Sequence, residues 1–139
     1  MSREAPLVLV ADDDPDVLSL VSFRLRRAGW RVVVVGDGLH ALKAIAECEP
    51  DVAVLDIGMP SLDGLDVCRA ARGTLPSRSM GIVFLSARSG ERDVARGIGA
   101  GADAYVRKPF SWEELLGPIE RVLSAQRQGP ELEPGLSAA

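Results

Sequence analysis

The chain has 139 residues, a length that fits one domain and not a large multidomain enzyme. Hydrophobic residues make up 47% and charged residues 26%, which is too apolar for a disordered chain. The formal net charge of −4 argues against tight non-specific binding to nucleic acid or to an anionic membrane surface.

Short aliphatic runs alternate five times with helix-like segments. The runs predict strands at 7–11, 31–35, 52–55, 81–85 and 104–107. The helix-like segments cover 15–28, 39–47, 64–72, 91–99 and 112–125, with Asp14 as the expected cap of the first and a capping box at 111–114 opening the last. Strands that are apolar throughout and separated by helices indicate an α/β fold with a doubly wound, five-stranded parallel sheet.

We expect residues 1–125 to form one domain. Residues 126–139 contain two glycines and two prolines and show no apolar periodicity, so we expect a flexible tail or linker stub there.

Cysteine and histidine are scarce. One histidine, His40, and two cysteines, Cys48 and Cys68, are too few for a His/Cys transition-metal centre or a disulfide framework. Both cysteines fall in predicted helices, where we expect them to face the core. The N-terminus lacks a signal-peptide apolar stretch, and no run approaches the ~20 apolar residues of a membrane span, so we expect a cytoplasmic protein with no membrane association.

Polar side chains stand where four of the five strands end. Asp12 and Asp13 follow the first strand, Asp56 the third, Ser86 the fourth and Lys108 the fifth. Ligands of open α/β sheets bind beyond the carboxyl ends of the strands, at the point where the strand order reverses. In the order 2-1-3-4-5 the first and third strands are neighbours there, so the three carboxylates converge on one crevice.

Three carboxylates in one crevice repel one another unless positive charge offsets them. Mg²⁺ takes oxygen ligands of this kind, and Lys108 adds a fixed positive charge. Carboxylates, a metal ion, a lysine and a hydroxyl together suit phosphoryl transfer, and a carboxylate can itself accept the phosphoryl group. Taken one by one, the same residues have plainer readings: Asp12 and Asp13 as a solvated strand end, Asp56 as a loop residue. The joint placement favours the functional reading.

Four segments resemble the receiver domain of two-component response regulators. They are Val8-Leu-Val-Ala-Asp-Asp-Asp-Pro15, Val54-Leu-Asp-Ile-Gly-Met-Pro-Ser-Leu-Asp-Gly64, Phe84-Leu-Ser-Ala87 and Gly101-Ala-Asp-Ala-Tyr-Val-Arg-Lys-Pro-Phe110. The resemblance covers about residues 7–125 and implies a flavodoxin-like (βα)5 fold. It also implies that Asp56 accepts a phosphoryl group from a sensor histidine kinase or a phosphotransfer protein.

The resemblance further implies a role for each matching residue. Mg²⁺ would be the cofactor, held by Asp13 and Asp56 directly, by Asp12 largely through water and by the backbone carbonyl of Gly58. Lys108 would pair with Asp56 and then, with Ser86, bind the phosphoryl oxygens. Pro109 would follow a cis peptide bond.

Ser86 and Tyr105 resemble the family's switch pair. A phosphoryl group adds charge and acceptor oxygens, so it would draw the Ser86 hydroxyl inward and let Tyr105 turn into the space that is left. The surface at about 90–124 would then change shape to control an output through an effector protein or an effector domain absent from the chain. We expect a monomer or a weak phosphorylation-dependent dimer, and no direct contact with nucleic acid.

Two other readings stay open. A magnesium phosphohydrolase resembling the haloacid dehalogenase class also uses an aspartate after its first strand, but that class needs further aspartates after its lysine, and none follows Lys108. A receiver-like interaction module that is never phosphorylated is the other. The favoured reading is a signalling switch and not an enzyme, with catalysis limited to its own phosphorylation and dephosphorylation.

Overall fold

The computed structural model describes residues 5–74, 80–87 and 90–138, with side chains through residue 126 except that of Thr74. Strands and helices alternate along the chain in five βα units. The strands are β1 (Leu7–Ala11), β2 (Arg31–Val35), β3 (Val52–Asp56), β4 (Gly81–Ser86) and β5 (Ala104–Arg107). The helices are α1 (Pro15–Arg27), α2 (Gly38–Cys48), α3 (Gly64–Thr74), α4 (Glu91–Gly99) and α5 (Trp112–Ala138).

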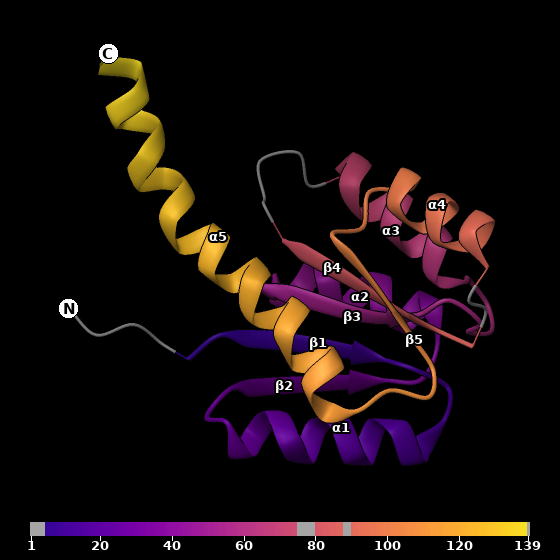
Figure 1. Cartoon of the computed structure of the whole chain (residues 1–139). Helices are drawn as coiled ribbons and strands as arrows, with labels where there is room; N and C mark the ends of the chain where they lie inside the picture. The colour runs from indigo at the N-terminus through magenta and orange to yellow at the C-terminus, as the bar shows by residue number, and fades with distance from the viewer. Residues whose placement is uncertain (1–4, 75–79, 88–89, 139) are drawn as a thin grey trace.

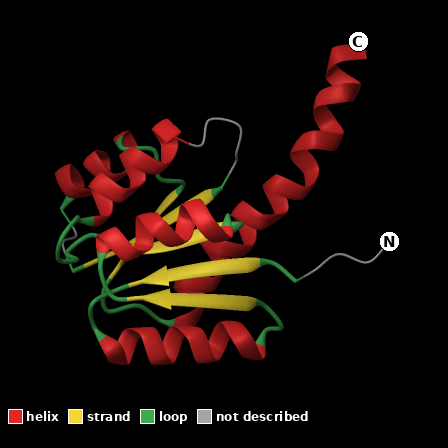
Figure 2. Cartoon of the chain, turned by 180° about the vertical axis from the view of Figure 1, so that it is seen from behind, coloured by secondary structure: helices red, strands yellow, loops and turns green. Residues whose placement is uncertain are grey.

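The strands form one parallel sheet in the order β2-β1-β3-β4-β5, which confirms the predicted doubly wound topology. Helices cover both faces of the sheet (Figures 1 and 2). Because alternate residues of a strand point to opposite faces, Leu9 and Ala11 pack under α2 and α3, whereas Val8 and Val10 pack under α1 and α5. The two apolar layers hold the carboxyl ends of the strands in register at one edge.

Local signals in the sequence account for most helix ends. Asp14 caps α1, because its carboxylate accepts a hydrogen bond from the Asp16 amide at 2.9 Å. The capping box before α5 has its predicted form: the Glu114 amide donates to Ser111 Oγ at 3.2 Å, and the Ser111 amide donates to Glu114 Oε1 at 2.8 Å.

Two expectations from the sequence do not hold. Cys68 is buried, but Cys48 is exposed because α2 ends at this residue, although it stands at helical spacing from the buried Ala44 and Ile45. Helix α5 does not end near residue 125 but continues to Ala138, and its last part projects from the sheet (Figure 1). A proline inside a helix removes one backbone hydrogen bond, but α5 continues through its prolines. Just before this extension, the Gln126 side chain donates to the Asp51 carbonyl at 2.9 Å and so ties α5 to the start of β3. The division at residue 125 itself stays a prediction.

Candidate phosphorylation site

The polar residues predicted from the sequence lie at one edge of the sheet. Asp56 and Ser86 end β3 and β4, while Asp12 and Lys108 directly follow β1 and β5. The backbone fixes these positions: the Asp12 amide donates to Val35 and the Lys108 amide donates to Ser86, at 3.2 and 2.7 Å. The fold therefore brings together side chains that are far apart along the chain.

Three carboxylates form the centre of this edge. One oxygen from each of Asp12, Asp13 and Asp56 lies within 4.8 Å of the others. Asp12 is 0% exposed and Asp56 is 6% exposed, whereas Asp13 is open to solvent. Burial raises the pKa of Asp56 above its ordinary value, the nearby Asp12 charge adds to this, and the Lys108 charge opposes it.

Lys108 supplies the positive charge predicted for the cluster, but it is shared between two carboxylates. Its Nζ donates to Asp12 Oδ2 at 2.8 Å and lies 3.4 Å from Asp56 Oδ1. Burial lowers the pKa of Lys108, but the hydrogen bond to Asp12 and the charges of Asp56 and Asp12 outweigh it, so the net pKa is raised. The lysine therefore stays charged at neutral pH. The peptide bond between Lys108 and Pro109 is cis.

Both oxygens of Asp12 have partners within the protein. Oδ2 accepts from Lys108, and Oδ1 accepts from the Asp14 backbone amide at 2.9 Å. Asp13 is the most open of the three carboxylates. The resemblance implies that Asp13 binds a metal directly and Asp12 largely through water, and the greater exposure of Asp13 is compatible with those roles.

The donor set fits a hard divalent cation. Carboxylate oxygens with room for water are the ligands that Mg²⁺ prefers, and the cluster carries more negative charge than Lys108 alone can offset. Gly58, whose backbone carbonyl is the fourth expected ligand, lines the same cavity as Asp56. A Cβ atom built at Gly58 would stand 3.9 Å from Asp56 Oδ2, so the backbone passes close to the acceptor carboxylate.

Gly64, the first residue of α3, makes a close approach that fixes the loop after β3. A Cβ atom there would lie 2.7 Å from the Asp56 carbonyl oxygen, and the Gly64 amide donates to the Ile57 carbonyl at 3.0 Å. Only glycine allows this contact. It ties the start of α3 to the end of the strand that carries Asp56.

A cavity of about 420 Å³ opens beside Asp56 and reaches toward α4. Ser86, Tyr105 and Lys108 line it, as the sequence led us to expect. The cavity also contains charged residues that sequence reasoning missed: Asp63, Asp93 and Arg96. The segment of α4 carries no motif, so only its packing against the site could identify Asp93 and Arg96. Asp63 has a structural role as well, because its carboxylate accepts from the Asp66 amide at 2.8 Å at the start of α3.

Tyr105 borders two cavities at once. It lines the cavity beside Asp56 and also a groove of about 480 Å³ between α4, β5 and α5. Its ring meets Phe84 edge-on, with the centroids 6.3 Å apart. A rotation of this ring would therefore change the shape of both spaces.

The family model of the response regulator receiver domain matches residues 8–120. The chain belongs to this family. Receiver domains are phosphorylation-controlled signalling modules that use Mg²⁺ at an acidic pocket, and the aspartate cluster described above lies at the corresponding edge of the fold.

Curated relatives of this receiver domain are bacterial regulators. The transcriptional regulatory protein KdpE of Mycobacterium tuberculosis is 39% identical over 127 residues, which cover 91% of this chain and 55% of KdpE. The DNA-binding response regulator MtrA of Mycolicibacterium smegmatis is 38% identical over 123 residues, which cover 88% of this chain and 53% of MtrA. The chain thus spans about half the length of the curated relatives that it matches.

Solved structures agree with this assignment. The Francisella response regulator 1452 receiver domain is 31% identical and covers 87% of this chain and 98% of its own, with a TM-score of 0.81. The BeF3-activated receiver domain of DrrB is 34% identical and covers 86% of this chain and 98% of its own, with a TM-score of 0.78. Within the described part of the receiver domain, no helix is long and apolar enough to cross a bilayer.

Proposed function

We propose that Asp56 is the phosphoacceptor of this receiver domain and that a sensor histidine kinase or a histidine phosphotransfer protein is the donor. One observation carries the proposal: Asp56 lies beside two further aspartates and a charged lysine, and it lines one cavity together with that lysine and a serine. The buried strand β3 holds Asp56 in place, so the carboxylate needs little reorganisation before it reacts.

In the transfer step an oxygen of Asp56 attacks the phosphorus atom of a phosphohistidine. The phosphorus–nitrogen bond breaks, and its electron pair returns to the imidazole. Lys108 would leave its contact with Asp56 to pair with a phosphoryl oxygen, and the Ser86 hydroxyl would donate to another. These are contacts to charge that develops during the transfer, which is where a preorganised site lowers the barrier most.

The metal role assigned to the aspartates completes this site. Asp13 and Asp56 would hold Mg²⁺ directly, the Gly58 carbonyl would add a ligand, and Asp12 would act largely through water. When bound, Mg²⁺ supplies positive charge that offsets the carboxylates and the phosphoryl oxygens.

The output of phosphorylation would be a change of the surface formed by α4, β5 and α5. Movement of Ser86 toward the phosphoryl group would open space for Tyr105. The position of Tyr105 between the acceptor cavity and the α4–β5–α5 groove supports this route. The energy comes from phosphoryl contacts that are better in one of two states, so the change is a shift of populations.

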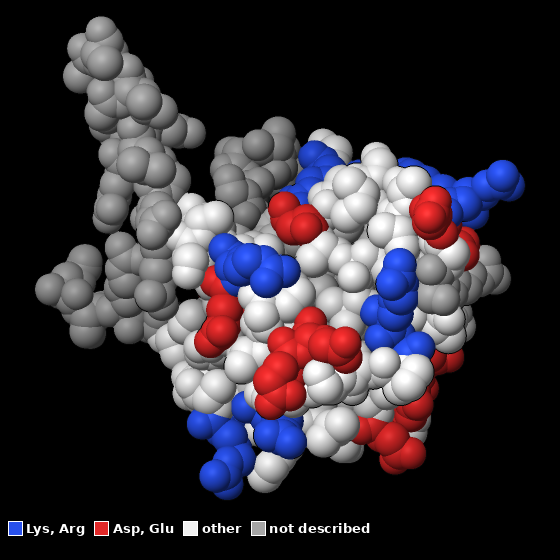
Figure 3. All heavy atoms as spheres, in the orientation of Figure 1, with Lys and Arg blue, Asp and Glu red and all other residues white. Residues whose placement is uncertain are grey.

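The partners follow from this role. The output would reach an effector protein or an effector domain outside this chain, and the receiver domain would act in the cytoplasm as a monomer or a weak phosphorylation-dependent dimer. Catalysis would be limited to its own phosphorylation and dephosphorylation. On the face shown in Figure 3, acidic and basic side chains interleave, and the described residues there form no broad basic surface of the kind that nucleic acid would favour.

Intact mass after incubation with acetyl phosphate and Mg²⁺ tests the proposal. We expect wild type to gain one phosphoryl group, Asp56→Asn to gain none, and the matched control Asp63→Asn, which lines the same cavity, to behave as wild type. Labelling that persists in Asp56→Asn and vanishes in Asp12→Asn would favour the phosphohydrolase reading, although Asp12 has both oxygens engaged. No label on wild type, together with no stabilisation by beryllofluoride and Mg²⁺, would favour the unphosphorylated module.

A further inference from the structure

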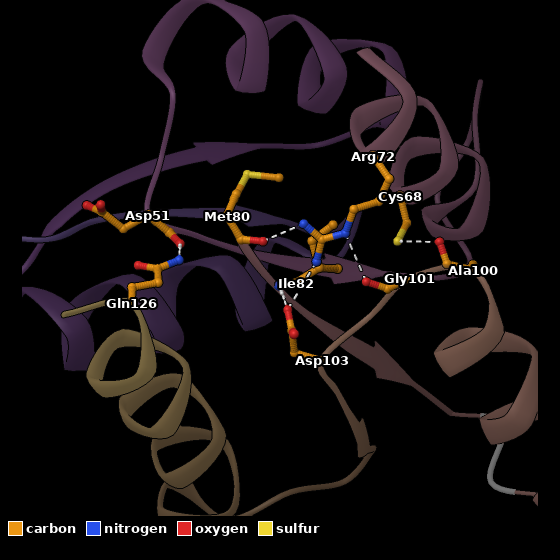
Figure 4. A network of polar contacts seen from close by, with 9 residues as sticks. All are labelled: Asp51, Cys68, Arg72, Met80, Ile82, Ala100, Gly101, Asp103 and Gln126. Atoms are coloured by element: carbon orange, nitrogen blue, oxygen red, sulfur yellow. Dashed lines mark hydrogen bonds and ion pairs between the residues drawn. The ribbon is translucent and has the colours of Figure 1, made fainter. Parts of the chain in front are cut away.

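A second polar network lies away from the acceptor site, where the end of α3 meets the turn between α4 and β5 (Figure 4). Its centre is Arg72 in the last turn of α3, whose three donor nitrogens are all used. Nε donates to the Gly101 carbonyl at 3.0 Å, and Nη1 donates to the Met80 carbonyl at 2.6 Å. Nη2 pairs with the Asp103 carboxylate at 3.1 Å.

The network continues into the sheet. The Asp103 oxygen that pairs with Arg72 also accepts from the Ile82 amide at 2.8 Å, and the Asp103 amide donates to the Ile82 carbonyl at 2.8 Å. Arg72 thus joins α3 to Met80, directly before β4, and to the turn that leads into β5, whose Asp103 contacts β4. A planar guanidinium with a fixed fork of donors suits such a three-way contact better than a lysine would.

The end of α4 receives one more contact from α3. The Cys68 thiol donates to the carbonyl of Ala100, the C-terminal cap of α4, at 3.2 Å. Burial raises the pKa of Cys68, so the thiol keeps its proton and remains a donor. The carbonyls of Ala100 and Gly101 are therefore both held by side chains of α3.

The rest of α4 is held much less firmly. Gly97 is the only buried residue among its nine, and the N-terminal cap residue is Gly90, which has no side chain to cap the helix. Gly97 lies so close to the sheet that a Cβ atom would stand 2.9 Å from the Tyr105 ring and 3.0 Å from Phe84. Helix α4 is thus fastened at its C-terminal end and rests on one glycine.

We propose that Arg72 is a positioning residue of the switch: with Cys68 it clamps the C-terminal end of α4, so that α4 answers events at the acceptor site by pivoting about that end. This proposal rests on the proposed function, because it concerns how the phosphorylated site reaches the output surface. It assigns a role to two residues of α3 that do not line the acceptor cavity.

A pivot at the C-terminal end of α4 would move residues that line the acceptor cavity and the α4–β5–α5 groove. Asp93, which lines the acceptor cavity, and Val94, which lines the groove between α4, β5 and α5, belong to the N-terminal half of α4, away from the clamp, whereas Arg96 belongs to its last turn. A helix rises about 1.5 Å per residue, so its nine residues reach about 12 Å from the clamp. A rotation of about 10° would then shift the far end by about 2 Å, the scale of helix shifts in known switches.

Amide hydrogen exchange measured by NMR on the full chain tests the clamp in the resting protein. The amides of residues 100–103 all donate to backbone carbonyls, so their exchange reports the opening of this turn. We expect Arg72→Met to raise their exchange rates about tenfold or more, as expected for the loss of hydrogen bonds to a charged group. Arg69→Met is the matched control, because Arg69 lies on the same helix and, among the described residues, forms its ion pair with exposed Asp66 at 3.8 Å, and it should change these rates less than twofold.

Beryllofluoride with Mg²⁺ then tests the pivot. In wild type we expect beryllofluoride to cause large changes in the amide NMR chemical shifts of residues 91–97 and small changes at 100–103. In Arg72→Met the large changes should extend through residue 103. Arg72→Lys, which keeps the charge but not the fork, should be intermediate. Should Arg72→Met fail to fold, Cys68→Ala removes one clamp contact alone and should raise exchange at 100–102 by a smaller factor.

Two results would overturn the proposal: equal exchange in Arg72→Met and Arg69→Met, or wild-type shifts at 100–103 as large as those at 91–97. A wild-type protein that binds no beryllofluoride would instead count against the proposed function. In that case the exchange comparison in the resting protein would still decide whether the clamp exists.

Discussion

Lys108 is held more closely by Asp12 than by Asp56, the residue that we propose to be phosphorylated. The Nζ–oxygen distances are 2.8 and 3.4 Å, and Asp12 is fully buried. In the resting protein the lysine therefore offsets a buried charge whose other hydrogen-bond partner, among the residues that the structure describes, is the Asp14 amide. A site arranged in this way keeps its lysine in place before any phosphoryl group arrives.

Removal of the lysine should destabilise the protein when no metal is added. Lys108→Met leaves Asp12 as a buried carboxylate without its counter-charge, and we expect the free energy of unfolding to fall by about 1–3 kcal/mol, between the effects typical of surface and buried ion pairs. Urea unfolding in EDTA measures this. The double variant Lys108→Met/Asp12→Asn should recover part of the loss. Arg107→Met, on the exposed side of β5, is the control. An equal loss of stability in Lys108→Met and Arg107→Met would contradict the conclusion that Lys108 offsets the charge of Asp12.

The raised pKa of Asp56 makes a prediction about stability and pH. Burial, and then the charge of Asp12, favours the protonated acid in the folded state, so the unfolded chain ionises first as the pH rises. The stability that protonated Asp56 contributes is complete below the unfolded pKa of about 3.9 and is lost as the pH rises through the higher folded pKa. At neutral pH the ionised carboxylate therefore costs stability in the metal-free protein.

Asp56→Asn should consequently raise the Tm of the metal-free protein at pH 7 by a few degrees. The gap to wild type should shrink as the pH falls through the raised folded pKa of Asp56, where the wild-type acid takes up its proton, and also on addition of Mg²⁺. Differential scanning calorimetry across this pH range checks the pattern, with Asp63→Asn as the control for a carboxylate of the same cavity. A gap that stays constant with pH would show that burial of the charge is not the cause.

The sheet and the meeting of the site residues could be predicted because both follow from periodicity. Apolar runs separated by helices dictate a parallel sheet, and the carboxyl ends of parallel strands share an edge, so Asp12, Asp56, Ser86 and Lys108 had to meet. The preference of Lys108 for Asp12 could not be predicted, because it depends on differences of less than 1 Å between side chains. Sequence patterns carry no information at that scale.

The contacts of Arg72 with the end of α4 could not be predicted from the sequence for a different reason. Arg72 ends an amphipathic helix, where a basic residue is common and usually solvated, and nothing in the sequence distinguishes it from Arg69. Only the fold brings the Gly101 and Met80 carbonyls to its guanidinium. The end of α5 was missed because Gly129, Pro130 and Pro134 are usual helix breakers, and their cost was not decisive here.

A methyl group at Gly97 should separate α4 from the sheet. Gly97→Ala would place Cβ 2.9 Å from the Tyr105 ring, so the ring or the helix must move, and we expect a loss of about 1–3 kcal/mol in the free energy of unfolding. Gly99→Ala is the matched control, since a Cβ there would meet no described atom within 4 Å beyond its chain neighbours and its own helix backbone, and alanine favours the helix by up to ~1 kcal/mol. Urea unfolding measures the change in the free energy of unfolding, and the NMR chemical shifts of the Tyr105 ring report its displacement. If both variants were equally stable, the close approach of α4 to Tyr105 would be in doubt.

Gly58 should shorten the life of the phosphorylated state. It presents no side chain beside Asp56, and its built Cβ atom would stand 3.9 Å from the acceptor oxygen, so water has an open path to the phosphorus atom through the cavity. Gly58→Asn would fill part of that path, and we expect dephosphorylation to slow several-fold while labelling by acetyl phosphate still occurs. Loss of the phosphoryl mass with time measures the rate. Gly36→Asn controls for a general effect of the substitution, because Gly36 lies outside the cavity lining and a Cβ there would meet no described atom within 4 Å beyond its chain neighbours. Faster loss of phosphate in Gly58→Asn than in wild type would mean that the asparagine amide orients water for attack more than it excludes it.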